Sequence, residues 1–213
     1  MNSYKIAIFG ASGKTGMQLV QQALDLGHSV TAIVRNPSQF TLGHKNLYVH
    51  QGDVLELNSF NHVMQGQDAI ISALGATSTA PTTVFSEGIR NVIQSMNAHG
   101  ISRVSVMSAL AVEINPIMAW WQRLFIKYIL QPILRNMYDD TLKMEYIMKQ
   151  TALDWTIVRP PQLTNKGVTG NYRVEASNHL HGANKISRAD VAHYMLRHLF
   201  DENTYRTTVE IAN

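Results

Sequence analysis

Three glycines spaced three residues apart, Gly10, Gly13 and Gly16, follow an apolar run and open a helical pattern. Glycine permits a tight turn and lets a ligand approach the backbone closely. The N-terminus of the following helix presents free N–H groups and a partial positive charge to an anion. Ser12 and Thr15 add hydroxyl groups for the same phosphates. The spacing predicts a cradle for the pyrophosphate of a dinucleotide, although a plain strand-to-helix turn gives the same local pattern.

Lys14 raises a competing interpretation, because Gly13-Lys14-Thr15 is similar to the end of a nucleoside-triphosphate P-loop. That motif requires a glycine five residues before the Gly-Lys pair. Ile8 stands at this position, inside the apolar run. The sequence therefore disfavours a kinase or NTPase, and Lys14 either adds charge to the cradle or is simply solvated.

Arg35 stands at the end of the next strand pattern, over residues 29–34. In β-α-β units of this kind, the strand end carries an acid for a ribose 2′-hydroxyl or a cation for a 2′-phosphate. Because Arg35 replaces the acid, we expect NADP(H) rather than NAD(H). The preference for NADP(H) rests on Arg35 alone, so NAD(H) stays open as an alternative.

Short apolar strands alternate with helical patterns along the whole chain. Strands are expected at 4–9, 29–34, 47–50, 68–73, 102–107, 154–158 and 207–211, and helices at 17–26, 54–65, 82–97, 117–131, 138–150 and 188–200, with a short irregular region after residue 161. This alternation predicts an α/β fold of the Rossmann type, a doubly wound and mainly parallel sheet in a single domain. Ligands lie beyond the carboxyl ends of such strands, so loops 10–16, 35–39, 52–54, 73–81, 107–116 and 159–170 should share one rim.

Composition limits the classes of function. The chain has 213 residues and a net charge of +3, which is too small to indicate a nucleic-acid partner. The absence of cysteine excludes disulfides and thiol chemistry. No apolar stretch is long enough to span a bilayer, and the first strand starts too early for a signal peptide, so we expect a cytoplasmic protein. His179 and His181 have no carboxylate at zinc-like spacing, and no metal is expected.

The chain resembles the atypical short-chain dehydrogenases in its glycine turn and in Val34-Arg35, Gly52-Asp53, Val106-Met-Ser108, the run 152–161 and the run 187–192. It is most similar there to the NAD(P)H-binding group of flavin reductase/biliverdin reductase B and to NmrA-like proteins. The resemblance implies that a dinucleotide contacts Gly10, Ser12, Gly13, Lys14, Thr15, Gly16, Arg35, Asp53, Val54, Ala73, Leu74, Gly75, Met107, Ser108, Pro160, Pro161 and Gln162. It implies that Asp53 accepts a hydrogen bond from the adenine amine; a helix cap near Leu55 is the alternative or additional role.

Most short-chain dehydrogenases donate a proton through a Tyr and a Lys four residues apart on one helix face. No Tyr-x-x-x-Lys occurs here, and Tyr138 and Lys143 are about 140° apart around a helix. Proton donation from solvent or from the substrate suits flavins, quinones and linear tetrapyrroles. Ser108 is the catalytic candidate, because by resemblance its hydroxyl lies beside the nicotinamide; a turn-capping serine is the alternative.

Residues 112–137 form a longer segment than the resemblance provides, rich in aromatic side chains and with three cations between Glu113 and Asp139. One interpretation is a lid or a homodimer helix that packs its apolar side on the core. Contact with an apolar substrate, through Trp120 together with Gln162, is the second. A helix on a membrane surface is the third.

The sequence favours an NADPH-dependent reductase that transfers hydride to a flat conjugated small-molecule acceptor. An NmrA-like sensor that binds the dinucleotide without turnover is the alternative, and the absent Tyr–Lys pair favours it.

Overall fold

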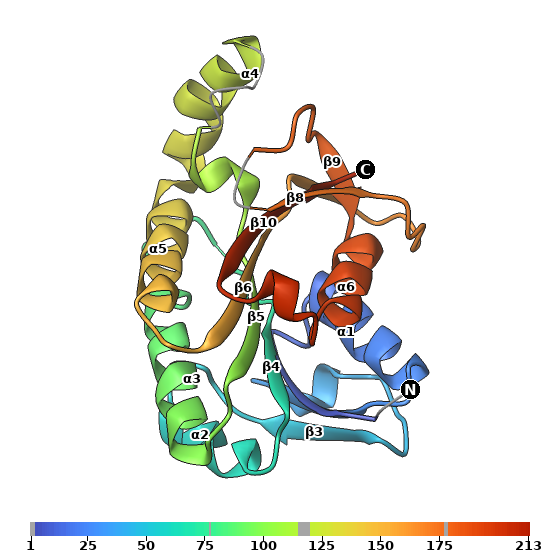
Figure 1. Ribbon diagram of the computed structural model, residues 1–213. Coiled ribbons are helices and arrows are strands. Elements are labelled where there is room, and N and C mark those ends of the chain that lie inside the picture. The colour runs from blue at the N-terminus through green and yellow to red at the C-terminus, as the bar shows by residue number, and fades with distance from the viewer. Residues whose placement is uncertain (1–2, 77, 115–119, 177–178) are drawn as a thin grey trace.

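The computed structural model describes residues 3–76, 78–114, 120–176 and 179–213, and shows a twisted sheet between two layers of helices (Figure 1). Eight strands lie in the order β3-β2-β1-β4-β5-β6-β10-β8. They are β1 (Lys5–Phe9), β2 (Ser29–Val34), β3 (Leu47–Gln51), β4 (Ala69–Ser72), β5 (Arg103–Met107), β6 (Asp154–Arg159), β8 (Arg173–Ala176) and β10 (Thr207–Ala212). Every pair is parallel except β8 with β10. The predicted doubly wound Rossmann-type sheet is confirmed.

Helices cover both faces of the sheet and bury most side chains of its central strands. On one face lie α1 (Lys14–Asp25) and α6 (Arg188–Arg197); on the other lie α2 (Leu57–Phe60), α3 (Ser86–His99) and α5 (Gln131–Lys149) (Figure 1). Alternate residues of β1 serve the two cores: Ile6 and Ile8 pack with α1 and α6, and Ala7 and Phe9 with α3. This double burial explains why the strand is apolar from Ile6 to Phe9.

The side chains that cap the starts of two helices come from different parts of the chain. Asp190 and Ser187 cap the start of α6 within one turn, since the Ser187 hydroxyl accepts from the Asp190 N–H at 2.9 Å. The start of α3 is instead capped from α5: buried Asp140 accepts from the Phe85 N–H at 2.9 Å and from the Ser86 hydroxyl. That contact ties the start of α3 to α5, its neighbour on the same face of the sheet.

The helix boundaries differ from the predictions in two places. The helix expected over 54–65 is a single turn, α2, followed by a 3-10 turn at Asn61–Met64. The helices expected at 117–131 and 138–150 are one continuous rod: α4 (Trp120–Phe125), a π-helical segment (Ile126–Leu130) and α5. Pro132 lies directly after the π-helical segment, where the backbone hydrogen-bond spacing of the rod changes. Residues 117–119 of that prediction lie outside the described residues.

The region predicted to be irregular after residue 161 contains three short strands. β7 (Gln162–Thr164) and β9 (Lys185–Ser187) form a separate parallel pair, and β8 adds an antiparallel edge to the main sheet. Strands of three or four residues carry too little pattern to stand out in a sequence, because their pairing is with distant segments. Over the described ranges, none of the helices is long and apolar enough to cross a membrane.

Candidate dinucleotide site

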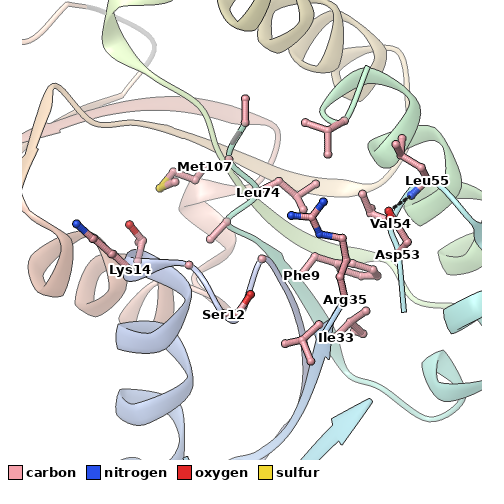
Figure 2. Close-up of a pocket in the computed structure, with 18 of the residues that line it drawn as sticks. Phe9, Ser12, Lys14, Ile33, Arg35, Asp53, Val54, Leu55, Leu74 and Met107 are labelled. Atoms are coloured by element: carbon pink, nitrogen blue, oxygen red, sulfur yellow. Dashed lines mark hydrogen bonds between the residues drawn. The ribbon is translucent and has the colours of Figure 1, made fainter. Parts of the chain in front are cut away.

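A cavity of about 640 Å³ opens at the carboxyl ends of β1, β2, β4 and β5 (Figure 2). This volume lies within the range of about 300–1,000 Å³ that is usual for ligand pockets. It is lined by Phe9, Gly10, Ser12, Gly13, Lys14, Thr15, Ile33, Val34, Arg35, Gly52, Asp53, Val54, Leu55, Ala73, Leu74, Gly75, Ala76, Thr82, Val84, Met107, Leu163 and Arg188. Residues from all six predicted loops therefore meet at one rim.

The glycine turn is packed so tightly that it excludes side chains. Gly10 has φ +73°, and a Cβ there would lie 2.4 Å from the Ala73 carbonyl oxygen on β4's exit loop. A Cβ on Gly16 would lie 2.0 Å from the Gly10 carbonyl oxygen, so Gly16 closes α1 onto the turn and does not line the cavity. The Gly13 N–H donates to the Gly10 carbonyl at 2.9 Å. The turn thus exposes backbone, as a pyrophosphate site requires.

The first turn of α1 supplies the anion-binding groups. Gly13 is the N-cap and brings no capping side chain, so the first N–H groups of the helix have no partner within the helix. Ser12, Lys14 and Thr15 line the cavity beside them. A helix N-terminus with free N–H groups and an adjacent cation fits a pyrophosphate.

Arg35 and Asp53 lie at one end of the cavity, and Lys14 and Met107 at the other (Figure 2). The Asp53 carboxylate accepts from the Leu55 N–H at 3.0 Å, which leaves its second oxygen for a ligand. The predicted helix cap at Leu55 needs correction, because α2 begins at Leu57 and Asp53 instead closes the turn before it. Arg35 is exposed, so its guanidinium is accessible to a 2′-phosphate.

Ser108 lies just beyond β5, but its hydroxyl points to a protein partner. It is buried and donates to Glu145 Oε1 at 2.6 Å, and it is not among the cavity-lining residues. Glu145, on α5, is bound by both ends of the Arg159 guanidinium, at 2.8 Å from Nε and 2.5 Å from Nη2. Arg159 Nη1 reaches Glu113 Oε2 at 2.6 Å. We call Ser108, Glu113, Glu145 and Arg159 the buried charge network.

Hydrogen bonds within the network stabilise the charged forms of Arg159 and Glu113. Burial alone would lower the pKa of Arg159, but the hydrogen bonds to Glu145 and Glu113 hold that pKa above its ordinary value. The hydrogen bond from Arg159 in turn lowers the pKa of Glu113. Glu145 was not predicted as a site residue. Its signal in the sequence is a carboxylate on the apolar face of a helix, between Met144 and Met148.

Other predicted site residues lie outside the cavity. Gln162 pairs with Lys185 in β7–β9, and the next residue, Leu163, lines the cavity instead, because side chains alternate along a strand. Pro160 and Pro161 precede this strand and are not among the lining residues. Trp120 is 73% exposed on α4 and lies away from the cavity.

Tyr138 and Lys143, whose spacing excludes a Tyr–Lys proton-donating pair, face different ways. Tyr138 is buried, and burial raises the pKa of its phenol. Lys143 is exposed and lines a surface groove between α3 and α5. Arg188, at the start of α6, is a cavity residue that was not predicted; its Nη1 donates to Asn165 Oδ1 at 2.7 Å.

The strand order, the glycine turn and the cavity define a Rossmann-type protein with a site built for a dinucleotide. A family model described as NAD(P)H-binding matches residues 10–202. The chain belongs to this NAD(P)H-binding family, and NAD(P)(H) is its cofactor.

Known proteins resemble the chain over nearly its full length. An uncharacterized chloroplastic protein of Arabidopsis thaliana is 28% identical, over 97% of this chain and 76% of its own. An oxidoreductase structure from Lactococcus lactis has a TM-score of 0.79 at 20% identity, covering 98% of this chain and 90% of its own. A short-chain dehydrogenase/reductase from Veillonella parvula, solved in complex with NADP, has a TM-score of 0.79 at 16% identity, covering 100% and 95%. At these identities the two structures show the fold alone.

Proposed function

We propose that this protein is an NADPH-dependent reductase that passes hydride to a flat conjugated acceptor such as a flavin, a quinone or a tetrapyrrole. The observation that carries the proposal is one cavity that holds both the glycine turn and apolar side chains. Leu74, Ala76, Met107 and Leu163 are among the apolar residues that line it. An apolar wall suits the face of a conjugated ring, and the cofactor itself supplies the hydride chemistry.

The chain's own residues would bind and orient both partners. The turn over residues 10–16 holds the pyrophosphate, Arg35 selects the 2′-phosphate, and Asp53 offers an acceptor to the adenine. Ser108 donates its hydroxyl hydrogen bond to Glu145 and does not line the cavity, so we assign it no contact with the cofactor. Catalysis then rests on orientation, with the acceptor's proton drawn from solvent.

A cofactor sensor without turnover is the second candidate. The chain has no Tyr-x-x-x-Lys, and Tyr138 and Lys143, which are five residues apart, face different environments. A protein that only reports the redox state of NADP(H) needs no proton donor.

NADPH oxidation by the purified protein distinguishes the two candidates. We expect turnover with at least one member of a panel of FMN, FAD and quinones, followed at the NADPH absorbance. Tight NADPH binding by calorimetry without oxidation by any acceptor would overturn the reductase and favour the sensor. The homodimer through residues 112–137 and the cytoplasmic location stay predictions.

A further inference from the structure

The rod that begins at Trp120 projects beyond the end of the sheet (Figure 1). Seven large apolar side chains on it are exposed: Trp120 (73%), Trp121 (58%), Leu124 (45%), Phe125 (50%), Tyr128 (65%), Ile129 (50%) and Ile133 (59%). We call this set the projecting face. Monomeric soluble proteins rarely leave so large a contiguous apolar surface in water, and such surfaces mark docking sites.

The projecting face points away from the protein. Residues four apart lie above one another on a helix, so the rod carries distinct rows. Ile126 and Tyr138 are buried and mark the row that faces the body. Trp121, Phe125 and Ile129 belong to an exposed row on another side. One apolar side of this segment therefore packs on the body at Ile126, while the other apolar side chains are exposed; the lid or homodimer role stays a prediction.

A row of cations flanks the apolar rows. Arg123, Lys127 and Arg135 are exposed and lie four or eight residues apart. The sequence contains no acid between Glu113 and Asp139. Only Arg135 has an ion-pair partner among the residues whose contacts are described, Asp139 at 3.5 Å. The Lys127 ammonium lies 5.3 Å from the ring centroid of Tyr128, so the cations and the aromatic rings are interleaved.

This combination matches the chemistry of an anionic bilayer surface. Aromatic side chains, Trp and Tyr above all, are favoured at the level of lipid headgroups, and cations beside them attract anionic lipids. A second copy of the chain fits less well, because a two-fold contact would bring the same cation row against itself without acids to neutralise it. We propose that the projecting face docks on the surface of an anionic phospholipid membrane. This proposal does not depend on the reductase activity.

Vesicle flotation with the full-length protein tests the docking. The probes are vesicles of phosphatidylcholine alone and vesicles with about one third phosphatidylglycerol. We expect binding to the anionic vesicles, weaker binding to the neutral ones, and a loss at high salt because screening weakens the charge attraction. Trp120 and Trp121 should also shift their fluorescence to the blue, whereas buried Trp155 reports no change.

Variants on the projecting face identify the contact. The double variant Trp121→Gln/Phe125→Gln should abolish flotation, and Arg123→Gln/Lys127→Gln should weaken it about 20- to 30-fold, at roughly fivefold per cation. Tyr146→Gln, an equally exposed aromatic on α5 outside the face, is the matched control and should leave flotation unchanged. Circular-dichroism melting and NADPH binding verify that each variant is folded.

Three outcomes would overturn the proposal. The first is that the folded wild-type protein does not bind anionic vesicles. Flotation that survives Trp121→Gln/Phe125→Gln is the second. The third is a dimer in sedimentation velocity that the same double variant dissociates, together with no vesicle binding, because the face would then be a contact between copies of the chain.

Discussion

Two regions at the carboxyl ends of the strands are built from different materials. The β1–α1 side uses backbone, a glycine turn that leaves N–H groups free and lines the cavity. The side formed by β5, β6 and α5 holds the buried charge network of residues 108, 113, 145 and 159, which does not line the cavity. The glycine turn depends on the absence of side chains, whereas the network depends on side chains that meet only after folding. We therefore expect substitutions in the two regions to have different effects.

The largest effect is expected from Glu145→Gln in the buried charge network. The substitution removes a charge that is 98% shielded from water by its partners and leaves the Arg159 guanidinium buried without it. Breaking one side of a buried ion pair typically costs about 3–5 kcal/mol. Urea unfolding followed by circular dichroism measures the loss.

Glu87→Gln is the matched control, because it removes an equivalent carboxylate from an exposed pair, Arg90 at 3.5 Å. Exposed pairs contribute about 0–1 kcal/mol. Equal losses in the two variants would show that Glu145 is not the centre of a buried network, and the contrast between the glycine turn and the network would not hold.

The next effect is expected from Gly10→Ala on the backbone side. The new Cβ would lie 2.4 Å from the Ala73 carbonyl, in a left-handed conformation at φ +73°. Overpacking and the left-handed conformation together should cost about 2–4 kcal/mol and weaken NADPH binding. Unfolding and calorimetric titration with NADPH measure both.

Gly27→Ala separates the two causes. Gly27 has φ +82°, but a Cβ there would have no atom within 4 Å. Its cost should be the left-handed conformation alone, about 1–2 kcal/mol, with unchanged NADPH binding. If Gly27→Ala weakened NADPH binding as much as Gly10→Ala, the close approach at Ala73 would not be what shapes the cradle.

The same division explains what could be predicted from the sequence. The glycine turn, Arg35 and the strand ends are local patterns, and the fold places them around one cavity as expected. Ser108 was expected at the end of β5, where it lies, but its partner was not predicted, because Glu145 is 37 residues away and reaches it only when α5 packs on β5. Contacts of that separation leave no periodicity in a sequence.

The projecting rod shows a second limit. The apolar pattern correctly indicated helix, but periodicity does not say which side of a helix is covered. Ile126 and Phe125 are adjacent and equally apolar, yet one is buried and the other is half exposed. Burial of a surface helix depends on where the body of the protein ends, and this rod extends past it (Figure 1).

Arg35→Ala should have the third-largest effect, and it should change only the preference for NADPH over NADH. A hydrogen bond to a charged group contributes about 1.5–3 kcal/mol, so NADPH affinity should fall about 10- to 150-fold while NADH affinity hardly changes. Titrations with the two cofactors measure the split. Arg90→Ala on α3 is the control and should change neither, because Arg90 does not line the cavity. Equal losses for NADPH and NADH would refute the 2′-phosphate role.

The smallest effect is expected at Glu113, the half-exposed member of the buried charge network. Arg159 lowers the pKa of this carboxyl, so the folded state binds its proton more weakly than the unfolded state does. The stabilisation is therefore complete above the ordinary carboxyl pKa of about 4.3 and is lost as pH falls through the lowered value. Glu113→Gln should lower the melting temperature slightly at pH 7, and the difference from wild type should shrink toward acid.

Melting curves between pH 7 and pH 3 test this sign, with Glu56→Gln as an exposed control that has no contact with Arg159. The control should show no comparable convergence. A deficit in Glu113→Gln that stayed constant down to pH 3 would mean that its side chain acts by packing and not by charge. Glu145 would then be the only network residue that neutralises Arg159. The hydrogen bond from Arg159 to Glu113 at 2.6 Å would contribute no charge stabilisation.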